Sequence, residues 1–469
     1  MPTSAGLLTD RYELTMLTAF VTDGRAEHPA VFEAFARRLP EGRRYGVLAG
    51  LGRLLPLIAS FTFDADEVAW LLAEGVVNEV TADYLRGFRF RGDVDAYREG
   101  DLYFPGSPIL TVRGTLGECV LLETLVLSVL NHDSAIASAA ARMVLAAGGA
   151  GDRGGRPLVE MGSRRTHEQA AIAVARAAYV AGFATTSNLA AGARYGVPTI
   201  GTAAHAFTLA YRSEAEAFAS QVAAQGVGTT LLVDTYDTAE GIRTAVEVAG
   251  HSLGAIRLDS GDLAEESGKA RALLDELGAT ETRIIVTSDL DEYVITALGD
   301  APIDGYGVGT RVATGSGHPT ASMVYKLVAV AGEPGGLLRP VAKRSHDKES
   351  VGGRKTAWRR HRAGTLVEEW YDLRDHHDHH EDRDNRDNSD NRDSSDDRGT
   401  RDDSSITAIQ VAAVRGGQIV HTPSLDEVRA TCAAALDSLP AEMRSVAAGL
   451  PYLTVSQRPA SHHEEGDHS

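Results

Sequence analysis

A unit repeated through the middle of the chain constrains the fold more than any other sequence feature. Each unit has a short apolar run, a turn of small or polar residues, and an Ala-rich amphipathic stretch. Seven runs occur in order: PLVEM (157–161), GFATT (182–186), VPTIG (197–201), TLLVD (230–234), GAIRL (254–258), RIIVTS (283–288) and DGYGVG (304–309). Apolar strands that alternate with helices are typical of parallel βα units. The sequence therefore predicts an α/β protein with a parallel barrel or a doubly wound sheet at residues 146–318.

The two flanks of this region have a different pattern. Residues 1–145 mix helical and strand-like segments, and residues 93–114 resemble strands around a turn at Pro105-Gly106. Residues 319–469 contain strand-rich stretches such as MVYKLVAV, TLVEEWYDL and ITAIQVAAVRGGQIV. We expect the flanks to pack together as a second, α+β domain built from both chain ends, since 469 residues exceed one ordinary core.

Residues 374–405 form a highly charged segment with almost no apolar side chains. Such a composition cannot bury enough surface to order the backbone, so the sequence predicts a disordered acidic loop that interrupts the C-terminal part. The HHDHH cluster within it could bind a divalent metal adventitiously, but we interpret it as part of a solvated tract.

Composition narrows the class of protein further. The formal net charge of -19 argues against binding to nucleic acid backbones, whereas a local basic pocket could still bind small anions. Two cysteines, Cys119 and Cys432, provide no disulfide framework, which suits a reducing cytoplasm. The N-terminus lacks the pattern of a secretion signal, and the apolar stretch at 119–130 is short and contains Glu123. We expect a soluble, cytoplasmic protein without membrane or nucleic-acid partners.

Polar side chains follow nearly every predicted strand. These strand ends are Glu160-Met161-Gly162-Ser163-Arg164-Arg165, Thr186-Ser187-Asn188, Gly201-Thr202 with His205, Asp234-Thr235-Tyr236-Asp237, Arg257-Leu258-Asp259-Ser260-Gly261-Asp262, Ser288-Asp289 and Gly307-Val308-Gly309-Thr310-Arg311. Active sites of βα barrels lie at the carboxyl ends of the strands, so the set predicts an enzyme site, although Asp237 and Asp262 could be helix caps. Arginines and glycine-rich turns suit phosphates, and aspartates suit ribose hydroxyls or Mg²⁺. A phosphorylated sugar is the expected substrate class.

The stretch GTAAHAF places His205 among small residues just after a buried run. A neutral imidazole is a competent nucleophile toward a phosphoryl group, and histidine also serves as an acid, a base or a structural residue. Arg257 has two open interpretations as well: it could bind a substrate carboxylate through its planar fork, or pair with Asp259 or Asp262. The residues alone leave both choices open.

Nine separate stretches, in this order, match the motifs of one known family: LLTDRYELTM, FEAFARRLPEGRRYGVLAGL, VLNHDSAIASAAAR, EMGSRR, TTSNLAAGARYGVPTIGTAAHAF, LLVDTYDT, IRLDSGDL, DGYGVGTRVAT and VYKLV. On these motifs the chain resembles the nicotinate phosphoribosyltransferase family over nearly its full length. It implies the type II phosphoribosyltransferase fold, an irregular TIM-like parallel barrel plus an α+β domain. It also implies ATP-coupled formation of nicotinate mononucleotide and pyrophosphate from nicotinate and phosphoribosyl pyrophosphate in NAD salvage, with Mg²⁺, by a homodimer.

The resemblance also assigns roles to individual residues. It implies that His205 is phosphorylated and that Asp259 is catalytic. It implies that nicotinate lies against Tyr12 of the other subunit, Thr202 and Arg257. The implied phosphoribosyl pyrophosphate contacts are Arg164, Asp289, Gly307, Gly309, Thr310 and Thr314; it names no metal ligand.

One departure and several rival functions remain at this stage. The family commonly has serine after this histidine, whereas this chain has Ala206, which leaves the strength of ATP coupling open. The rivals are the same transfer to nicotinamide or quinolinate, a catalytically inactive homologue that binds nucleotides, and a metal-storage or metal-sensing protein that uses HHDHH. Retention of His205 and Arg257 argues against the inactive homologue.

Overall fold

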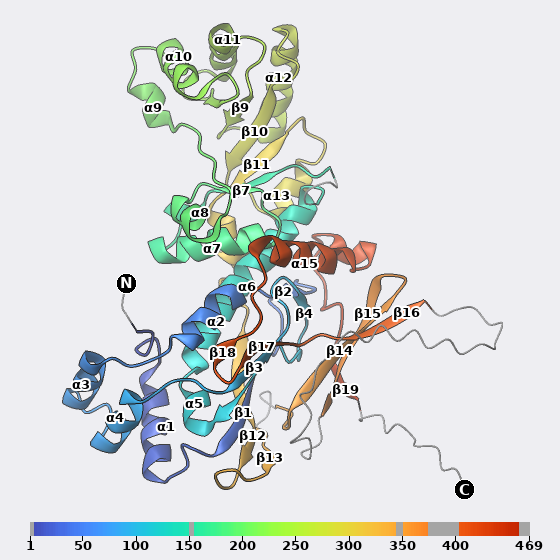
Figure 1. The fold of residues 1–469 in the computed structure, drawn as a ribbon. Helices are drawn as coiled ribbons and strands as arrows, with labels where there is room; N and C mark the ends of the chain where they lie inside the picture. The colour runs from blue at the N-terminus through green and yellow to red at the C-terminus, as the bar shows by residue number, and fades with distance from the viewer. Residues whose placement is uncertain (1–3, 150–153, 344–349, 374–402, 459–469) are drawn as a thin grey trace, which may run out of the picture.

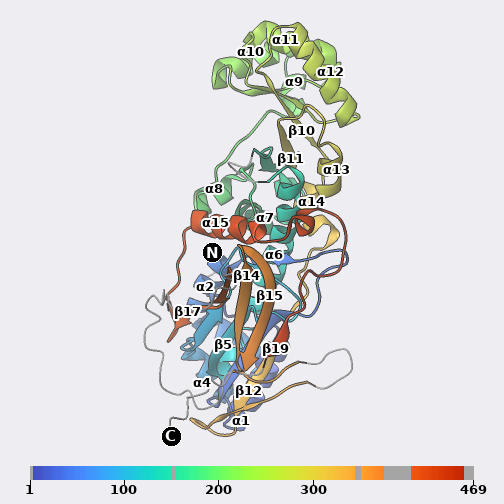
Figure 2. The same ribbon diagram turned by 90° about the vertical axis from the view of Figure 1, so that its right-hand side faces the viewer.

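The computed structural model describes residues 4–149, 154–343, 350–373 and 403–458. It is elongated, with a parallel sheet and its helices at one end and antiparallel sheets at the other (Figure 1). The long helix α6 (Glu123–Ala146) runs between the two parts. The turned view shows the same division, with α15 (Leu425–Asp437) lying across the junction (Figure 2).

The parallel sheet has six strands in the order β7-β6-β11-β10-β9-β8. Its strands are β6 (Leu158–Glu160), β7 (Thr185–Thr186), β8 (Thr230–Leu232), β9 (Ala255–Leu258), β10 (Arg283–Ser288) and β11 (Gly305–Val308). Six of the seven predicted runs therefore form strands. The third run contributes a single parallel bridge between Thr186 and Thr199.

The sheet forms a half barrel and does not close. Among the described residues, no pairing joins the third run at 197–201 to β8. Pro198 has no N–H to donate to a ladder, and the small residues after Ile200 lead directly into helix α9 (His205–Leu209). The predicted α/β class is confirmed, and the predicted barrel is open between its third and fourth strand positions.

Helices follow the strands as the repeat predicted. They are η2 (Gly162–Arg164), α7 (Glu168–Val180), α8 (Leu189–Tyr195), α9, α10 (Glu214–Gln225), α11 (Thr238–Ala249), α12 (Leu263–Glu276), α13 (Glu292–Ala297), α14 (Thr310–Ala313) and η3 (Gly315–Gly317). Asp237 accepts a hydrogen bond from Glu240 N (2.9 Å), and Asp262 accepts one from Ala264 N (3.1 Å). Both aspartates are helix caps, as one of their two sequence interpretations proposed.

Strands from both ends of the chain build the antiparallel part. They are β1 (Pro29–Ala36), β2 (Gly46–Val47), β3 (Asp93–Ala96), β4 (Leu102–Tyr103), β5 (Leu110–Thr115), β12 (Met323–Ala331), β13 (Leu338–Pro340), β14 (Lys355–Arg362), β15 (Thr365–Leu373), β16 (Ser404–Ala408), β17 (Val411–Arg415), β18 (Gln418–Ile419) and β19 (Ser456–Arg458). The seven-stranded sheet has the order β13-β12-β1-β5-β3-β17-β18, and β2 pairs with β4 in a separate two-stranded sheet. The four-stranded sheet has the order β16-β14-β15-β19, in which β19 is parallel to β15. The expected α+β domain from both chain ends is therefore present.

The remaining helices pack on the antiparallel part or join it to the half barrel. They are α1 (Arg11–Thr22), α2 (Leu51–Ala59), α3 (Ala65–Ala73), α4 (Glu79–Arg86), α5 (Leu116–Val120), α6, α15 and η4 (Ala441–Arg444). The stretch Leu116–Ala146 is long and apolar enough to cross a membrane by length and composition, with a mean hydropathy of 1.4. However, 67% of its most apolar window is buried within the protein, as expected for a core helix.

The predicted acidic loop needs one correction. Ser404 and Ser405 belong to strand β16, which pairs with Arg362 and His361 of β14. Backbone pairing orders these two residues despite their polar side chains. Asp403 is also described, and its carbonyl accepts a hydrogen bond from Ala363 N (2.9 Å). Residues 374–402, which include HHDHH, lie outside the described residues.

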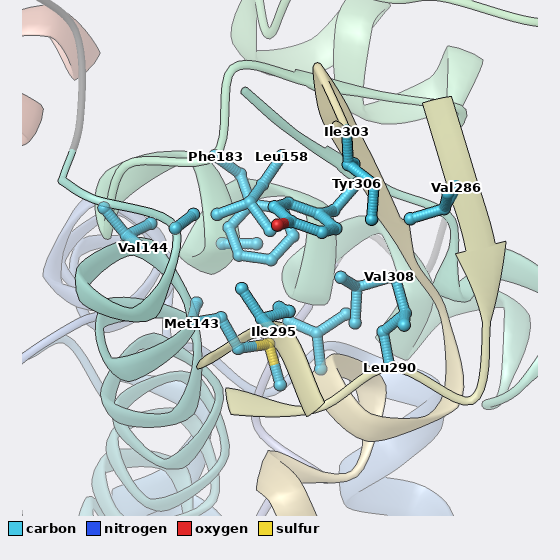
Figure 3. Packing of buried hydrophobic residues seen from close by; sticks show 14 of the residues in the cluster. Met143, Val144, Leu158, Phe183, Val286, Leu290, Ile295, Ile303, Tyr306 and Val308 are labelled. Carbon is cyan, nitrogen blue, oxygen red and sulfur yellow. The ribbon is translucent and has the colours of Figure 1, made fainter. Parts of the chain in front are cut away.

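Two hydrophobic cores hold the parts together. In the half barrel, Met143 and Val144 of α6 pack with Phe183, Tyr306 and Val308 (Figure 3). A second core joins α1 to α6 with the seven-stranded sheet. The strands are thus anchored from within, while their carboxyl ends stay free to carry polar side chains.

A buried charge network joins the four-stranded sheet to the segment between β3 and β4. Arg359 of β14 donates from Nε to Glu369 Oε2 of β15 (2.8 Å), and from Nη1 to Asp101 Oδ1 in the loop before β4. Tyr97 donates its hydroxyl to Glu369 Oε1 (2.9 Å). Arg359 is 5% exposed and Glu369 is 1% exposed, so water contributes little to either charge. The buried charges of Arg359 and Glu369 are therefore stabilised by their protein partners.

Candidate active site

The predicted site residues gather where the parallel strands end. Strands β9, β10 and β11 are neighbours in the sheet, so the residues that follow them, Asp259, Asp289 and Gly309, share one edge. Parallel strands place all their carboxyl ends on the same side, which explains why residues distant in the sequence meet. We call this edge the rim.

Arg257, on β9, has the most contacts at the rim. It donates from Nε to Thr287 Oγ1 (2.9 Å), from Nη1 to Thr202 Oγ1 (2.9 Å), and from Nη2 to Asp259 Oδ1 (3.0 Å). Its side chain is 12% exposed. The ion pair with Asp259 that the sequence left open is therefore present. These contacts fix the planar fork, which suits a carboxylate.

His205 begins α9 and lies beside the same aspartate. Its Nε2 is 3.7 Å from Asp259 Oδ2, and its Nδ1 is 3.2 Å from Thr235 Oγ1. The side chain is 41% exposed, so the imidazole is accessible to reactants. Asp259 thus links the histidine to Arg257. An exposed imidazole beside a carboxylate can exchange protons or attack a phosphorus atom.

Asp259 is held in its ionised form. Burial raises the pKa of its carboxyl, but the hydrogen bond from Thr287 and the charges of Arg257 and His205 lower it more, so the pKa lies below its usual value. The negatively charged carboxylate of Asp259 therefore lies between the imidazole of His205 and the guanidinium of Arg257.

Asp234, at the end of β8, offers an oxygen for a cation. Its Oδ2 accepts from Asp259 N (2.7 Å) and Ser260 Oγ (2.9 Å), whereas its buried Oδ1 has no hydrogen-bond partner among the described residues. Glu214 also has a buried oxygen, Oε1, without a hydrogen-bond partner among the described residues. Burial, together with the charges of Asp234 and Asp237, raises the pKa of Glu214 to about 6. Within the part of the chain that the structure describes, no group of three or more His, Cys, Asp or Glu could hold a metal ion by itself.

Comparison with known proteins now adds to this geometry. The chain is 55% identical to nicotinate phosphoribosyltransferase pncB1 of Mycobacterium tuberculosis (strain CDC 1551 / Oshkosh) over 465 residues, covering 97% of this chain and 96% of that protein. The chain belongs to the nicotinate phosphoribosyltransferase family. The model of the nicotinate phosphoribosyltransferase N-terminal domain matches residues 7–131. A nicotinate phosphoribosyltransferase of Bacillus subtilis is 41% identical over 76% of this chain and 73% of its own length.

Solved structures support the fold of the family. Human nicotinic acid phosphoribosyltransferase superposes with a TM-score of 0.72, at 24% identity, over 96% of this chain and 97% of its own. The nicotinate-nucleotide pyrophosphorylase of Pyrococcus furiosus gives a TM-score of 0.69, at 23% identity, over 92% of this chain and 95% of its own. At these identities the likeness establishes the architecture alone.

The residues that the family resemblance assigns to phosphoribosyl pyrophosphate lie along the rim. Arg164 is exposed at the end of η2, just after β6, and Asp289 is exposed after β10. Thr310 begins α14, and Thr314 follows it, donating its hydroxyl to Thr310 O (2.9 Å). The structure thus brings Arg164, Asp289 and these threonines to the same edge as Arg257.

Gly307 has a structural reason to be glycine. It lies inside β11, where an added methyl would come within 2.5 Å of Thr287 Cγ2 and 2.8 Å of Met161 Sδ. A larger residue would displace Thr287 from Arg257 and Asp259. Gly309 is less crowded, with Met161 O at 3.2 Å from an added methyl. Packing alone explains Gly307, independently of any contact with substrate.

Tyr12 is not brought to the rim within one chain. It lies on α1 with 45% of its surface exposed, and α1 is at the opposite end of the molecule from β9 and β10 in both views (Figures 1 and 2). An exposed aromatic ring far from the other candidate residues can serve the site only from a second subunit.

Three rim residues escaped the sequence-based site assignment. Thr287 was hidden as one polar residue inside the apolar run RIIVTS, although it bonds Arg257 and Asp259. Thr235 was recognised as part of a polar strand end, but no motif assigned it a role, although its Oγ1 lies 3.2 Å from His205 Nδ1. Glu160, 1% exposed, accepts from Thr186 Oγ1 (2.5 Å) and so ties β6 to β7, and burial raises its pKa. Side-chain geometry, which the sequence lacks, was needed to select them.

Proposed function

We propose that this protein transfers the phosphoribosyl group of phosphoribosyl pyrophosphate to nicotinate, forming nicotinate mononucleotide and pyrophosphate for NAD biosynthesis. The observation that carries the proposal is the position of Arg257, whose fork is fixed by Thr202, Thr287 and Asp259 at the rim. A fixed guanidinium favours the nicotinate carboxylate over the neutral amide of nicotinamide. The relatives named above carry the same activity in their names.

The proposed reaction is a displacement at the anomeric carbon of ribose. The pyridine nitrogen forms a bond to this carbon while the bond to pyrophosphate breaks, and the leaving group takes the electron pair. The nitrogen carries no proton, so no general base is required. The protein's task is to align the two reactants and to stabilise charge, with Arg164 and the first backbone N–H groups of α14, from Thr310 to Val312, available to the phosphates.

A magnesium ion fits this proposal as a partner of the pyrophosphate. Mg²⁺ prefers oxygen ligands and is commonly held by one or two carboxylates together with substrate phosphates. Asp234, with its buried, unpartnered Oδ1, is the residue that fits such an ion. When bound, the ion would neutralise charge on the leaving group.

ATP coupling through His205 is the second part of the proposal. Phosphorylation of the exposed imidazole would place a dianion near Arg257 and favour the formation of pyrophosphate. The hydroxyl absent from Ala206 has a counterpart in Thr235, whose Oγ1 lies 3.2 Å from Nδ1. Thr235 could therefore orient the ring in place of the missing serine.

The His205→Ala variant is expected to form nicotinate mononucleotide without responding to ATP. The wild-type rate should rise on addition of ATP, because phosphorylation stabilises the productive state, whereas alanine offers no nucleophile. The assay combines phosphoribosyl pyrophosphate, Mg²⁺ and nicotinate with and without ATP, and quantifies the mononucleotide. A radiolabelled γ-phosphate should be retained by the wild type and not by the variant.

Other outcomes of this assay distinguish the rivals. Equal rates with and without ATP in the wild type would keep the transferase and remove the coupling. Turnover of nicotinamide, or of quinolinate with release of carbon dioxide, in place of nicotinate would contradict the role of Arg257. No turnover of any of the three pyridines would leave a nucleotide-binding homologue without activity.

We further propose that the active form is a homodimer in which Tyr12 completes the partner's site. Two exposed apolar groups support this assembly. Leu7, Leu8 and Tyr12, 42%, 54% and 45% exposed, lie near α1, and Leu189 and Leu209, 76% and 60% exposed, lie on α8 and α9. In a dimer with twofold symmetry, the apolar residues near α1 of each subunit would pack against those on α8 and α9 of the other, which makes two equivalent contacts. Tyr12 could then stack on the pyridine ring.

Mixing two inactive variants should restore activity if this dimer is correct. Tyr12→Ala and Arg257→Ala would each impair both sites of their own homodimer, whereas a mixed dimer contains one intact site. Random exchange in equal amounts should therefore return about a quarter of the wild-type rate. The measurement is the rate before and after subunit exchange, with the dimer verified by sedimentation. Failure of exchanged dimers to regain activity would contradict the shared site.

A further inference from the structure

Three charged side chains are buried together behind the rim. Glu292, the first residue of α13, is 1% exposed, Arg142 of α6 is 4% exposed, and Arg43 of the segment before β2 is 6% exposed. Arg142 Nε lies 3.0 Å from Glu292 Oε1, and Arg43 Nη1 lies 3.2 Å from the same oxygen. We call these three residues the Glu292 cluster.

The Glu292 cluster holds an unusual turn. Glu292 Oε2 accepts from Ser316 Oγ (2.6 Å), and Arg43 Nη2 donates to Gly315 O (3.3 Å). Gly315, Ser316 and Gly317 all have positive φ, of 61°, 53° and 86°. A side chain disfavours this left-handed region, so Ser316 stays there because its surroundings determine its position.

The turn and Glu292 adjoin the two segments expected to contact phosphoribosyl pyrophosphate. Gly315 directly follows Thr314, which ends the Gly307–Thr314 segment made of the end of β11 and helix α14. Glu292 begins α13, three residues after Asp289 in the loop that follows β10. One buried carboxylate therefore joins both segments. The two arginines come from the N-terminal part of the chain and α6, so they anchor these segments to the rest of the molecule.

The Glu292 cluster also places positive charge behind these two segments. Burial raises the pKa of Glu292, but the hydrogen bond from Ser316 and the charge of Arg43 lower it by more. The pKa therefore lies below its usual value, and the residue is ionised. Two guanidinium groups then face one carboxylate, and Arg43 Nη1 has no hydrogen-bond partner among the described residues. The excess positive charge favours an anion at the adjacent rim.

We propose that Glu292, together with Arg43 and Arg142, is a positioning residue that aligns the Asp289 loop and the Gly307–Thr314 segment for phosphoribosyl pyrophosphate. This inference rests on the proposed function, since it takes that compound as the anionic substrate. Glu292 acts through these two segments and does not itself contact substrate. Its loss should therefore affect one substrate far more than the other.

Two substitutions test the alignment. Glu292→Gln removes the charge that draws the arginines together, and Ser316→Gly removes the hydroxyl while allowing the positive φ. Each is expected to raise the KM for phosphoribosyl pyrophosphate on the order of tenfold to a hundredfold, because small misplacements of binding groups have effects of this size. The KM for nicotinate should stay within about threefold, and Ser316→Gly should keep the wild-type Tm.

The matched control is Glu33→Gln, which alters a buried ion pair far from the rim. Lys355 Nζ lies 2.8 and 2.9 Å from the two oxygens of Glu33, and both residues belong to the antiparallel part. This variant should lower Tm without changing the ratio of the two KM values. Wild-type KM values for phosphoribosyl pyrophosphate in both Glu292→Gln and Ser316→Gly, or equal rises for the two substrates, would overturn the proposal.

Calorimetric titration separates this inference from the proposed function. Phosphoribosyl pyrophosphate with Mg²⁺ is titrated into wild type, Glu292→Gln and Ser316→Gly without any pyridine present. Weaker binding by both variants supports the positioning role even if the wild type turns over no nicotinate. Equal binding by all three overturns it even if the transferase activity is found.

Discussion

Replacing Arg257 with alanine is expected to lower kcat/KM for nicotinate by about two orders of magnitude. Truncating one partner of a hydrogen-bonded charge pair costs roughly 2–5 kcal/mol, and about 1.4 kcal/mol corresponds to a tenfold change. The substitution would remove the cation proposed for the nicotinate carboxylate and also leave Asp259 without its 3.0 Å ion pair. Arg257→Lys should recover only part of the loss, because an ammonium group cannot reproduce the planar fork.

Steady-state rates with nicotinate and nicotinamide provide the measurement. The preference for nicotinate should fall in Arg257→Ala, because the charge that distinguishes the two pyridines is gone. Arg283→Ala is the matched control, since Arg283 is exposed at the amino end of β10, at the opposite edge of the sheet from the rim. An Arg257→Ala enzyme that retains both rate and preference would contradict the proposed recognition of nicotinate.

Replacing Arg359 with alanine should destabilise the protein by about 3–5 kcal/mol. The substitution leaves Asp101 and Glu369 without their shared cation, and Glu369 is 1% exposed, so water cannot replace the lost partner. Thermal unfolding followed by circular dichroism should show a decrease in Tm of about 10 °C, given a shift of roughly 2–4 °C per kcal/mol for a large domain.

Arg360→Ala is the control for this stability prediction. Arg360 is the next residue on β14, where its guanidinium pairs with Glu368 at 3.5 Å with both side chains about 30% exposed. Such partly exposed pairs contribute about 0–1 kcal/mol, so its Tm should change little. Similar shifts in both variants would show that burial of the Arg359 network is not the source of its stability.

Patterns along the chain were sufficient to predict the parallel βα units and the rim. Continuous apolar runs identified the strands, and the rule that parallel strands end at one edge selected Arg257, Asp259 and Asp289 before any geometry was known. The short stretches after the runs also suggested Asp237 and Asp262 as caps, which both are. These features depend on local periodicity and on strand direction, and a sequence records both.

Other features depend on contacts between distant residues and could not be predicted. The opening of the barrel follows from the single bridge at Thr199, and the third run resembles the other strands in composition. Thr287 acquires its importance only because Arg257 and Asp259 lie on the neighbouring strand. Likewise, Glu292 and Ser316 are 24 residues apart, and nothing in either local sequence indicates that they meet.

The order of strands in the seven-stranded sheet has a consequence for synthesis on the ribosome. Strand β1 lies between β5 and β12, and about 290 residues separate the end of β1 from the start of β12. At roughly 5–20 residues per second, one edge of β1 waits tens of seconds for its partner. The nascent N-terminal region therefore exposes an unpaired strand edge throughout translation of the half barrel, and we expect chaperones to protect it during that interval.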